Sequence, residues 1–359
     1  MPNESTRFDR RQLLRASGTA ATVGMIGLAG CADDDDDGDM NGDDMNGDDD
    51  GDDGESLDIT VAYASGPEAT QTRAVESEFI DRIEDETDGR ISFDLQAGTL
   101  GGSEDILDAT QAGSVDMVLE SPEATATRFA SGYTFAGDPF VIRDMDHYRA
   151  VEEEFLLPDD GMNGELIDSG LRMFQGFRWG NRGVTANVPV RTPEDVQGIQ
   201  MRLPEFDSWV GVWEEIGVDA TPVAFDELYS ALETGVAEAS EGPITQFMDT
   251  SLYEVQTHFS DTQHLLSMHT FIMNEDFYQG LAPDDRDYLE TVMEEAADDI
   301  TEVLFGGEQD DFDAARDEGT TIIEQDEIDR EAFVEAGQPF LEELAEEEWA
   351  VDFEAIQAL

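Results

Sequence analysis

Arginine is the side chain whose placement is most informative in this sequence, because it is scarce and lysine is absent. The 359 residues include 87 Asp and Glu but only 18 Arg. Two arginines stand among apolar and aromatic neighbours, Arg178 in Gly-Phe-Arg-Trp and Arg202 in Met-Arg-Leu-Pro. A guanidinium binds a carboxylate through two parallel hydrogen bonds, and aromatic neighbours keep water away from that contact. Both arginines are candidates to bind an organic acid; the alternative for each is a structural ion pair.

The sequence offers little support for catalysis or for a bound cofactor. His147 stands alone, and His258, His264 and His269 are spaced six and five residues apart, which fits no metal-binding motif. No Gly-x-Ser-x-Gly elbow, phosphate-binding loop or dinucleotide-binding fingerprint is present. The single cysteine, Cys31, excludes a disulfide framework and a thiolate metal cage. We expect a protein that is not an enzyme and has no cofactor.

The excess of acidic residues excludes one class of binding partner and resembles the composition of proteins that work in high salt. A formal net charge of -69 excludes a nucleic-acid binder that neutralises phosphates with basic side chains. Residues 57–359 carry 71 acids and 14 arginines, a formal charge of -57. With 39% hydrophobic residues and 20 Phe, the chain still has enough apolar surface for a core. The lysine-free, acid-rich composition resembles that of proteins from extreme halophiles.

The first 31 residues are typical of an export signal. Arg10 and Arg11 precede a short apolar run over residues 16–30, and Leu-Ala-Gly-Cys closes this run at Cys31. The run is too short for a stable membrane span, and twin arginines indicate the export route for folded proteins. The closing box resembles a lipoprotein cleavage site. We therefore expect a Tat-type lipoprotein signal peptide and lipidation of Cys31 as the only attachment to the membrane.

A tether is predicted after Cys31. Residues 32–55 contain 14 acidic residues together with Gly, Asn and Met, and no aromatic or β-branched residue. Such a segment buries nothing and repels itself, so we expect a disordered acidic tether. No stretch after residue 31 has the roughly 18 consecutive apolar residues of a membrane span.

Strands and helices alternate from residue 57, which places the candidate arginines in an α/β fold. Residues 57–63 and 91–95 alternate apolar and polar side chains and are predicted strands, whereas residues 73–85 are a predicted amphipathic helix. This order predicts a parallel, right-handed unit. Ligands of open α/β sheets bind beyond the carboxyl ends of the strands. Arg202 lies near the end of the predicted strand 199–203, so we expect it beside a ligand.

Two segments repeat one pattern, which predicts two lobes built alike. Residues 104–118 have an acid pair, two apolar residues, an Ala and a terminating Gly before a strand, and residues 226–239 match this order. The second lobe includes a helix start at residues 192–195, where Thr is the cap and Pro the first helical residue. The chain from residue 244 onward is mostly helical by its periodicity.

Two stretches of the second lobe carry a family resemblance. Residues 192–204 (TPEDVQGIQMRLP) and 220–232 (ATPVAFDELYSAL) resemble the signature of the solute-binding proteins of tripartite ATP-independent periplasmic (TRAP) transporters. The first lobe is similar too, through residues 87–90, 100–102 and 113–117. The resemblance implies a two-lobed, periplasmic-binding-protein-like α/β fold with a long helix crossing the hinge. It also implies that the lobes close on a small organic acid and deliver it to the TRAP membrane permease subunits.

The resemblance assigns roles to single residues. Arg202 matches the strand-end arginine that pairs with the substrate carboxylate, Arg178 matches a second arginine, and Phe225 matches an aromatic residue that packs on the ligand. We expect four further residues in the ligand site: Glu205, Trp179, Tyr63 and Ser65.

Residues 241–243 depart from the family pattern. Where the family often has Glu-Asn-Pro, this sequence has Glu241-Gly242-Pro243, which removes one side-chain contact to the ligand. Some members bind 2-oxo acids or lactate through a metal ion, for which Glu241 is the candidate. Because an acid near a pocket is more often structural, we predict no metal site.

The expected organisation has five segments: a signal peptide (1–30), the lipidated cysteine and tether (31–56), lobe I (57–176), lobe II (177–267) and a helical C-terminal segment that completes both lobes (268–359). We expect an extracytoplasmic receptor, lipid-anchored at the cell surface, for a C4-dicarboxylate or sugar-acid-like ligand. The alternative is an exported lipoprotein with a sensory or enzymatic role, such as a hydrolase or lyase, on the same scaffold. The enzymatic alternative needs a catalytic set that the sequence does not offer.

Overall fold

The computed structural model describes residues 56–359, apart from the side chain of Asp226. The predicted signal peptide, Cys31 and almost all of the predicted tether lie outside the described residues. The strands are β1 (Leu57–Tyr63), β2 (Ile91–Ala97), β3 (Met117–Glu120), β4 (Leu171–Ala186), β5 (Gln200–Leu203), β6 (Asp219–Pro222), β7 (Ala239–Pro243), β8 (His258–Asn274) and β9 (Thr321–Ile323).

Helices connect these strands and follow them to the C-terminus. The α-helices are α1 (Thr70–Val75), α2 (Asp81–Glu86), α3 (Ser103–Gln111), α4 (Pro122–Phe129), α5 (Met145–Val151), α6 (Met162–Asp168), α7 (Asp207–Ile216), α8 (Leu228–Thr234), α9 (Ile244–Asp249), α10 (Glu275–Gly280), α11 (Pro283–Asp317), α12 (Arg330–Glu347) and α13 (Phe353–Gln357). No helix within residues 56–359 combines the length and the apolar character needed to cross a membrane.

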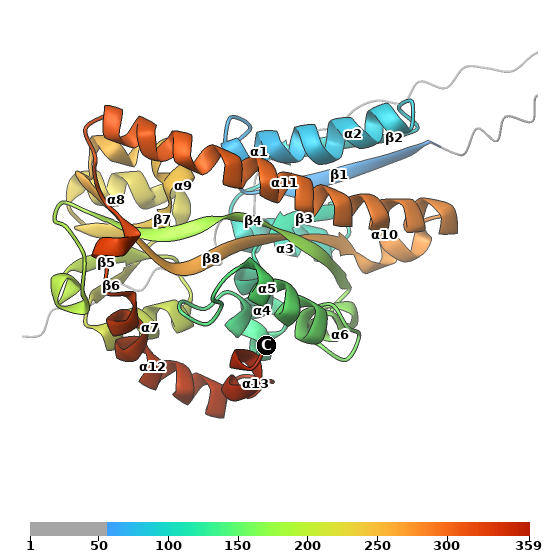
Figure 1. The fold of residues 1–359 in the computed structure, drawn as a ribbon. Helices are drawn as coiled ribbons and strands as arrows, with labels where there is room; N and C mark the ends of the chain where they lie inside the picture. The colour runs from blue at the N-terminus through green and yellow to red at the C-terminus, as the bar shows by residue number, and fades with distance from the viewer. Residues whose placement is uncertain (1–55) are drawn as a thin grey trace, which may run out of the picture. The chain divides into compact units, whose positions relative to one another are not determined.

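One sheet runs through the described chain, in the order β2-β1-β3-β8-β4-β7-β5-β6, with β9 beside β8. At one end β1 pairs in parallel with β2 and β3, and at the other end β5 pairs in parallel with β6 and β7. The long antiparallel strands β4 and β8 join these two parallel units (Figure 1). The fold is therefore a two-lobed α/β fold, and β4 and β8 belong to both lobes.

The sequence patterns correspond to the observed elements. The alternating segment 57–63 is β1, and the two matching segments form α3 and α8, which end at Gly113 and Gly235 in the left-handed region with φ of 70° and 73°. Glycine adopts this conformation without a steric penalty, which explains why both helices end there. The predicted helix start at residue 192 is a single 3₁₀ turn, η4 (Pro193–Val196), and the backbone N–H of its cap residue Thr192 donates to the Asp195 carboxylate at 3.0 Å.

The predicted helix over residues 73–85 contains an irregularity. It consists of α1, a π-turn named η1 (Glu76–Ile80) and α2 in direct succession. A π-turn inserts one extra residue per turn. Val75, Phe79 and Ile83 are nevertheless all buried, so the apolar face predicted from the sequence is the face that packs.

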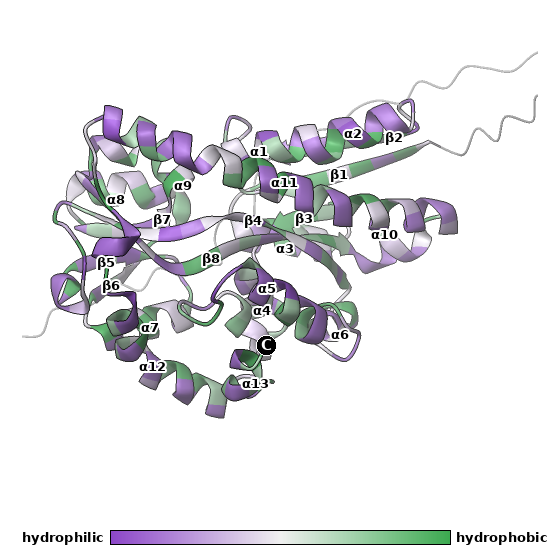
Figure 2. Cartoon of the chain, viewed as in Figure 1, coloured by the Kyte–Doolittle hydropathy of each residue, from purple (hydrophilic) through white to green (hydrophobic). Residues whose placement is uncertain are grey.

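Helix α11 is the longest element and contacts both parts of the sheet. It packs on β4, on α1 and η1 of the first lobe, and on α9 and β9 at the second (Figure 1). Its buried residues, from Leu289 through Ile300 to Leu304, recur every three or four positions, and Figure 2 shows hydrophilic residues recurring between them. This spacing buries one stripe of the helix and leaves its acidic remainder exposed.

Candidate functional site

Arg202 lies at the carboxyl end of β5 and is buried, with 2% of its surface exposed. Its Nε donates a hydrogen bond to the backbone oxygen of Val223 at 2.9 Å, which holds the side chain at the end of β6. Among the carboxylates whose positions are described within residues 56–359, none forms an ion pair with this guanidinium. Burial lowers the pKa of Arg202 to about 10, and the nearby charge of Arg182 lowers it further while Glu241 opposes the shift.

Arg182, on β4, is the second arginine of this region and was missed by the sequence analysis. Its Nε and Nη2 donate to the two carboxylate oxygens of Glu241, the Nη2 contact being 2.8 Å long, and its Nη1 donates to Ser267 at 3.1 Å. The guanidinium carbon lies 5.0 Å from the ring centre of Trp209. Arg182 lies between Asn181 and Gly183, only four residues after Arg178, so the same scarcity of arginine could have identified it.

Arg178 is held elsewhere. Its Nη2 donates to both carboxylate oxygens of Glu308 on α11, at 2.7 and 2.9 Å, and its guanidinium carbon lies 5.1 Å from the ring centre of Phe305. This is the structural ion pair that the sequence analysis kept as the alternative. The arginine whose charge acts on Arg202 is therefore Arg182, and a ligand role for Arg178 stays a prediction.

Glu241 lies on β7 and is 1% exposed. Burial alone would raise its pKa, but Arg182 and His264 hold the pKa down to about 2, so the carboxylate is ionised. Nε2 of His264 lies 3.2 Å from Glu241, and Nδ1 lies 2.8 Å from the hydroxyl of Thr262. Within residues 56–359 no group of three or more His, Cys, Asp or Glu is arranged to hold a metal ion.

A second histidine connects β8 with the first lobe. The Tyr63 hydroxyl lies 2.6 Å from Nδ1 of His269, and the Trp179 ring packs against this histidine with centroids 5.0 Å apart. Burial lowers the pKa of His269 to about 3 and raises that of Tyr63 well above its usual value, so both groups are neutral at pH 7. His264 and His269 are both buried and hydrogen-bonded, and the sequence pattern alone did not indicate that either one contacts the arginine region.

Of the remaining predicted ligand-site residues, some are buried and others are exposed. Ser65 is buried and accepts a hydrogen bond from Gln71 at 2.7 Å. Phe225 is 46% exposed, two residues after the Val223 carbonyl that holds Arg202. Glu205 is exposed but close enough to raise the pKa of Arg202. Tyr63 and Trp179 thus contact His269, whereas Glu205 lies near Arg202 and Phe225 follows the segment that holds Arg202.

Because Gly242 has no side chain, the side chain of Gln246 occupies the space beside it. A Cβ built at Gly242 would lie 2.8 Å from the amide nitrogen of Gln246, a residue of α9 that is 3% exposed. The Gln246 amide therefore packs where the side chain of residue 242 would begin, and it is a neutral hydrogen-bonding group at this position.

The two lobes contact each other beside the cluster formed by Arg182, Arg202 and Glu241. Trp209 Nε1, on α7, donates to the Gly137 oxygen at 2.9 Å, and the neighbouring Ser208 hydroxyl donates to Glu123 on α4 at 3.2 Å. Trp209 therefore contacts Arg182 with its ring and the first lobe with its N–H. Movement of one lobe against the other would change the surroundings of the arginines.

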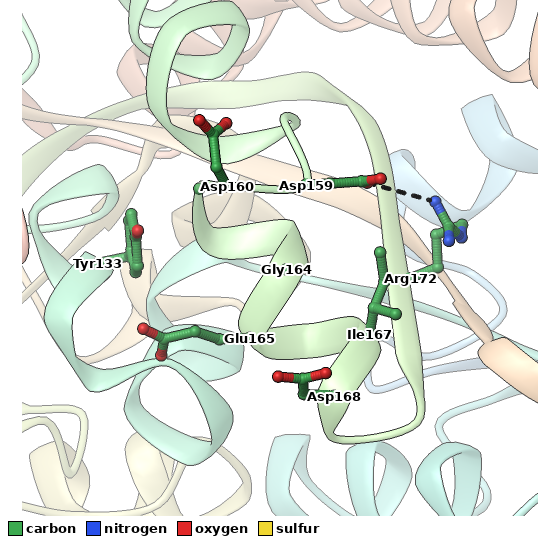
Figure 3. A pocket seen from close by; sticks show the side chains of 9 residues that line it. Tyr133, Asp159, Asp160, Gly164, Glu165, Ile167, Asp168 and Arg172 are labelled. Carbon is green, nitrogen blue, oxygen red and sulfur yellow. Dashed lines mark ion pairs between the residues drawn. The ribbon is translucent and has the colours of Figure 1, made fainter.

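A surface hollow lies elsewhere, in the first lobe around α6. It has a volume of about 360 Å³ and is bordered by Asp159, Asp160, Glu165, Asp168 and Arg172 (Figure 3). The guanidinium of Arg172 is already paired with Glu275, at 2.7 Å. The four acidic residues that line the hollow repel an anion, so the hollow does not suit an organic acid.

Comparison with known proteins agrees with this arrangement. Residues 61–348 match the model of the family described as bacterial extracellular solute-binding protein, family 7 (DctP). The chain belongs to this family. Its members are the solute receptors of TRAP transporters, which bind small acids outside the cytoplasm, so this family member is a transport protein and not an enzyme.

Individual relatives are similar at a moderate level. The ectoine-binding periplasmic protein TeaA of Halomonas elongata is 27% identical over 68% of this chain and 72% of its own length. The sialic acid-binding periplasmic protein SiaP of Vibrio cholerae is 28% identical over 69% of this chain and 72% of its own. A solved TRAP solute-binding protein from Sulfitobacter with bound β-D-galacturonate has a TM-score of 0.73 and 26% identity, covering 81% of this family member and 95% of that chain.

Proposed function

We propose that this family member is the receptor of a TRAP transporter for a small organic acid, such as a C4-dicarboxylate or a sugar acid, whose carboxylate binds Arg202. The acid would then pass to the membrane permease subunits. Tyr63, Trp179 and His269 would supply neutral and aromatic contacts from the first lobe and the shared strands.

The observation that carries this proposal is the isolated charge of Arg202. A buried guanidinium is costly unless it is paired and hydrogen-bonded. Nε of Arg202 is fixed by Val223, which leaves the terminal nitrogens to form two hydrogen bonds to a carboxylate. Several relatives bind acids, namely sialic acid, 2,3-diketo-L-gulonate and galacturonate, which supports an acid as the ligand here.

We further propose that α11, β4 and β8 carry the motion that opens and closes the site. All three elements contact both lobes, and a receptor of this kind must admit the acid before burying it.

We also propose that the signal segment directs export and that Cys31 carries the lipid anchor. Lipid on Cys31, detected by mass spectrometry of membrane-extracted protein, tests the anchor, and its absence there would refute it.

A thermal-shift screen in about 2 M salt tests the main proposal. The panel contains monocarboxylates, dicarboxylates, sugar acids and 2-oxo acids, with the corresponding sugars and amides as uncharged controls. A ligand that binds only the folded state raises its stability by RT ln(1 + [L]/Kd). We expect at least one acid to raise the melting temperature while its uncharged analogue does not. A panel without any stabilising acid would contradict the proposal.

A further inference from the structure

We propose that Glu123 and Asp138 of the first lobe, the carboxyl pair, form a proton-dependent latch with α7 of the second lobe. The latch holds the two lobes together while the carboxyl pair is protonated and releases them as the pair ionises. This inference goes beyond the proposed function, because it concerns the movement of the lobes and not the identity of the ligand.

Two consecutive residues of α7 are hydrogen-bonded to the first lobe at this place. The Ser208 hydroxyl donates to Oε1 of Glu123 at 3.2 Å, and Nε1 of Trp209 donates to the backbone oxygen of Gly137 at 2.9 Å. The side chains of Ser208 and Trp209 are both buried. Because each hydrogen bond joins one lobe to the other, both must break when α7 moves away from α4.

The loop that carries Asp138 packs directly on α4. A Cβ built on Gly137 would lie 2.6 Å from Cβ of Glu123, so the glycine permits this close approach. Asp138 and Glu123 are 1% and 2% exposed. Both carboxyl oxygens of Asp138 and Oε2 of Glu123 are buried without a hydrogen-bond partner among the described residues. An ionised carboxylate in such a position is costly, so the closed arrangement favours the protonated form.

The charged groups around the carboxyl pair act in the same direction. Burial is the largest cause of the shift for both residues, and it raises the pKa of Asp138 to about 7. The charge of Asp138 further raises the pKa of Glu123, and Glu348, just after α12, further raises the pKa of Asp138. Two carboxyl groups this close do not both ionise readily.

Hydroxyl groups from three elements oppose this shift in part. Thr127 of α4 and Ser208 of α7 lower the pKa of Glu123, and Ser208 and Thr134 of the 3₁₀ turn η2 (Ser131–Ala136) lower that of Asp138. The guanidinium of Arg182, which packs on the ring next to Ser208, is already bonded to Glu241. The hydroxyl groups are neutral, so they do not compensate a second negative charge on the pair.

Opening of the lobes changes the surroundings of the carboxyl pair. With the lobes apart the carboxyl groups contact water, and Asp138 titrates near its ordinary pKa of 3.8 instead of about 7. The closed form therefore binds more protons than the open form between these two values. It is favoured at low pH, and this advantage is lost as the pH rises toward 7. One proton corresponds to a change of about tenfold in the closed-to-open ratio per pH unit.

The indole N–H of Trp209 reports the latch directly, because its hydrogen bond crosses from one lobe to the other. Its exchange with solvent is measured by NMR on the ligand-free protein in about 2 M salt between pH 5 and pH 8, and is expressed as protection relative to free indole at each pH. We expect the protection to fall by about tenfold or more over this range. The radius of gyration from small-angle X-ray scattering should increase in parallel.

Three variants separate the titration from the contact itself. Asp138→Asn keeps the shape of the side chain but does not ionise, so the protection of Trp209 should stay nearly constant with pH. Ser208→Ala removes one hydrogen bond and keeps the carboxyl pair, so it should lower the protection by a similar factor at every pH. Asp160→Asn, at an exposed position of the first lobe, should keep the wild-type profile.

Several results would overturn the latch. A wild-type protection that is constant with pH would refute it, even where Asp138→Asn fails to fold. Trp179 and Trp349 are internal references in the same spectra, and an equal loss of protection at all three indoles would indicate global unfolding instead. A loss at Trp209 without a change in the radius of gyration would refute the link to lobe movement. None of these measurements uses a ligand, so each leaves the proposed carboxylate site untouched.

Discussion

At the scale of single residues, Arg202 is a buried cation whose pKa of about 10 still leaves it protonated at neutral pH. We predict that Arg202→Ala weakens binding of the acid found by screening by about 30-fold or more. Removing one partner of a buried charge pair typically costs about 2–5 kcal/mol, and 1.4 kcal/mol corresponds to tenfold in affinity. Arg202→Lys should recover only part of this loss, because lysine keeps the charge but not the planar fork.

Calorimetry in high salt measures this effect. Arg316→Ala is the matched control, because Arg316 is exposed at the end of α11 and pairs with Asp313 and Glu324. An Arg202→Ala affinity within about threefold of the wild type would require the carboxylate site to be placed elsewhere.

The two arginines of β4 should differ in their effect on stability. Arg182→Ala leaves Glu241 buried without its cation, and breaking a buried ion pair costs about 3–5 kcal/mol. Arg178→Ala leaves Glu308, whose side chain is 15% exposed and can be hydrated more readily. We therefore expect the larger decrease in the free energy of unfolding for Arg182→Ala, measured by denaturant titration in high salt. Equal decreases in the free energy of unfolding for the two variants would contradict the prediction that the Arg182–Glu241 pair matters more for stability than the Arg178–Glu308 pair.

At the scale of elements, the contact between α7 and α12 requires a glycine. A Cβ on Gly211 of α7 would overlap the ring of Phe340 on α12, whereas one on Gly306 of α11 would meet no atom within 4 Å. Gly211→Ala should destabilise the fold by about 1–3 kcal/mol through overpacking. Gly306→Ala should stabilise it by about 0.5–1 kcal/mol, since alanine loses less backbone entropy in a helix. Melting curves of the two variants should shift in opposite directions.

The contact between α4 and α7 should depend on pH. Burial raises the pKa of Asp138 to about 7 and raises that of its neighbour Glu123, and the carboxyl oxygens of Asp138 have no hydrogen-bond partner among the described residues. A carboxyl group whose pKa is raised on folding stabilises the fold below its unfolded pKa, 3.8 for Asp138, and this stability is lost as the pH rises toward 7. The shift of about three units corresponds to at most about 4 kcal/mol.

Asp138→Asn should remove most of this dependence. Its melting temperature minus that of the wild type should increase between pH 4 and pH 8, because the variant no longer has to ionise a buried carboxyl group. Asp160→Asn, at an exposed position, serves as the control for general charge repulsion. A difference that stays constant over this range would show that Asp138 ionises freely in the folded state.

At the scale of the whole molecule, the charge of -57 over residues 57–359 predicts a dependence on salt. The Debye length is roughly 3 Å at 1 M and roughly 10 Å at 0.1 M, so neighbouring carboxylates repel one another far more in dilute salt. We expect the melting temperature to fall steeply between these two conditions. Sodium chloride and potassium chloride should act alike if screening is the cause. A melting temperature that is flat across this range would contradict the prediction.

Local sequence patterns predicted several elements correctly. The alternation over residues 57–63 and the glycine-terminated segments ending at Gly113 and Gly235 depend on neighbours along the chain, which the sequence displays directly. The π-turn at residues 76–80 was not predicted, because its apolar side chains keep nearly the same spacing as in an α-helix. The position of Arg202 at the end of a strand was also evident, since one short strand and its following proline define it.

Which of the two arginines, Arg178 or Arg182, lies near Arg202 could be determined only from the tertiary structure. Both lie on β4 four residues apart, so simple alternation would give them the same surroundings. The pairing of β4 with β8 is shifted between Arg178 and Gly180, that is, between the two arginines, so the alternation of side chains does not continue unchanged from Arg178 to Arg182.

The sequence by itself determined the family, the α/β class and a buried arginine at the end of β5, because these depend on composition, periodicity and contiguous motifs. Only the tertiary structure decided which second arginine joins it and which acid neutralises that arginine. Arg182, Glu241 and His264 come from three strands and meet through the order β8-β4-β7 in the sheet. Contacts between strands so distant in sequence follow from how the sheet assembles, and no local pattern along the chain encodes them.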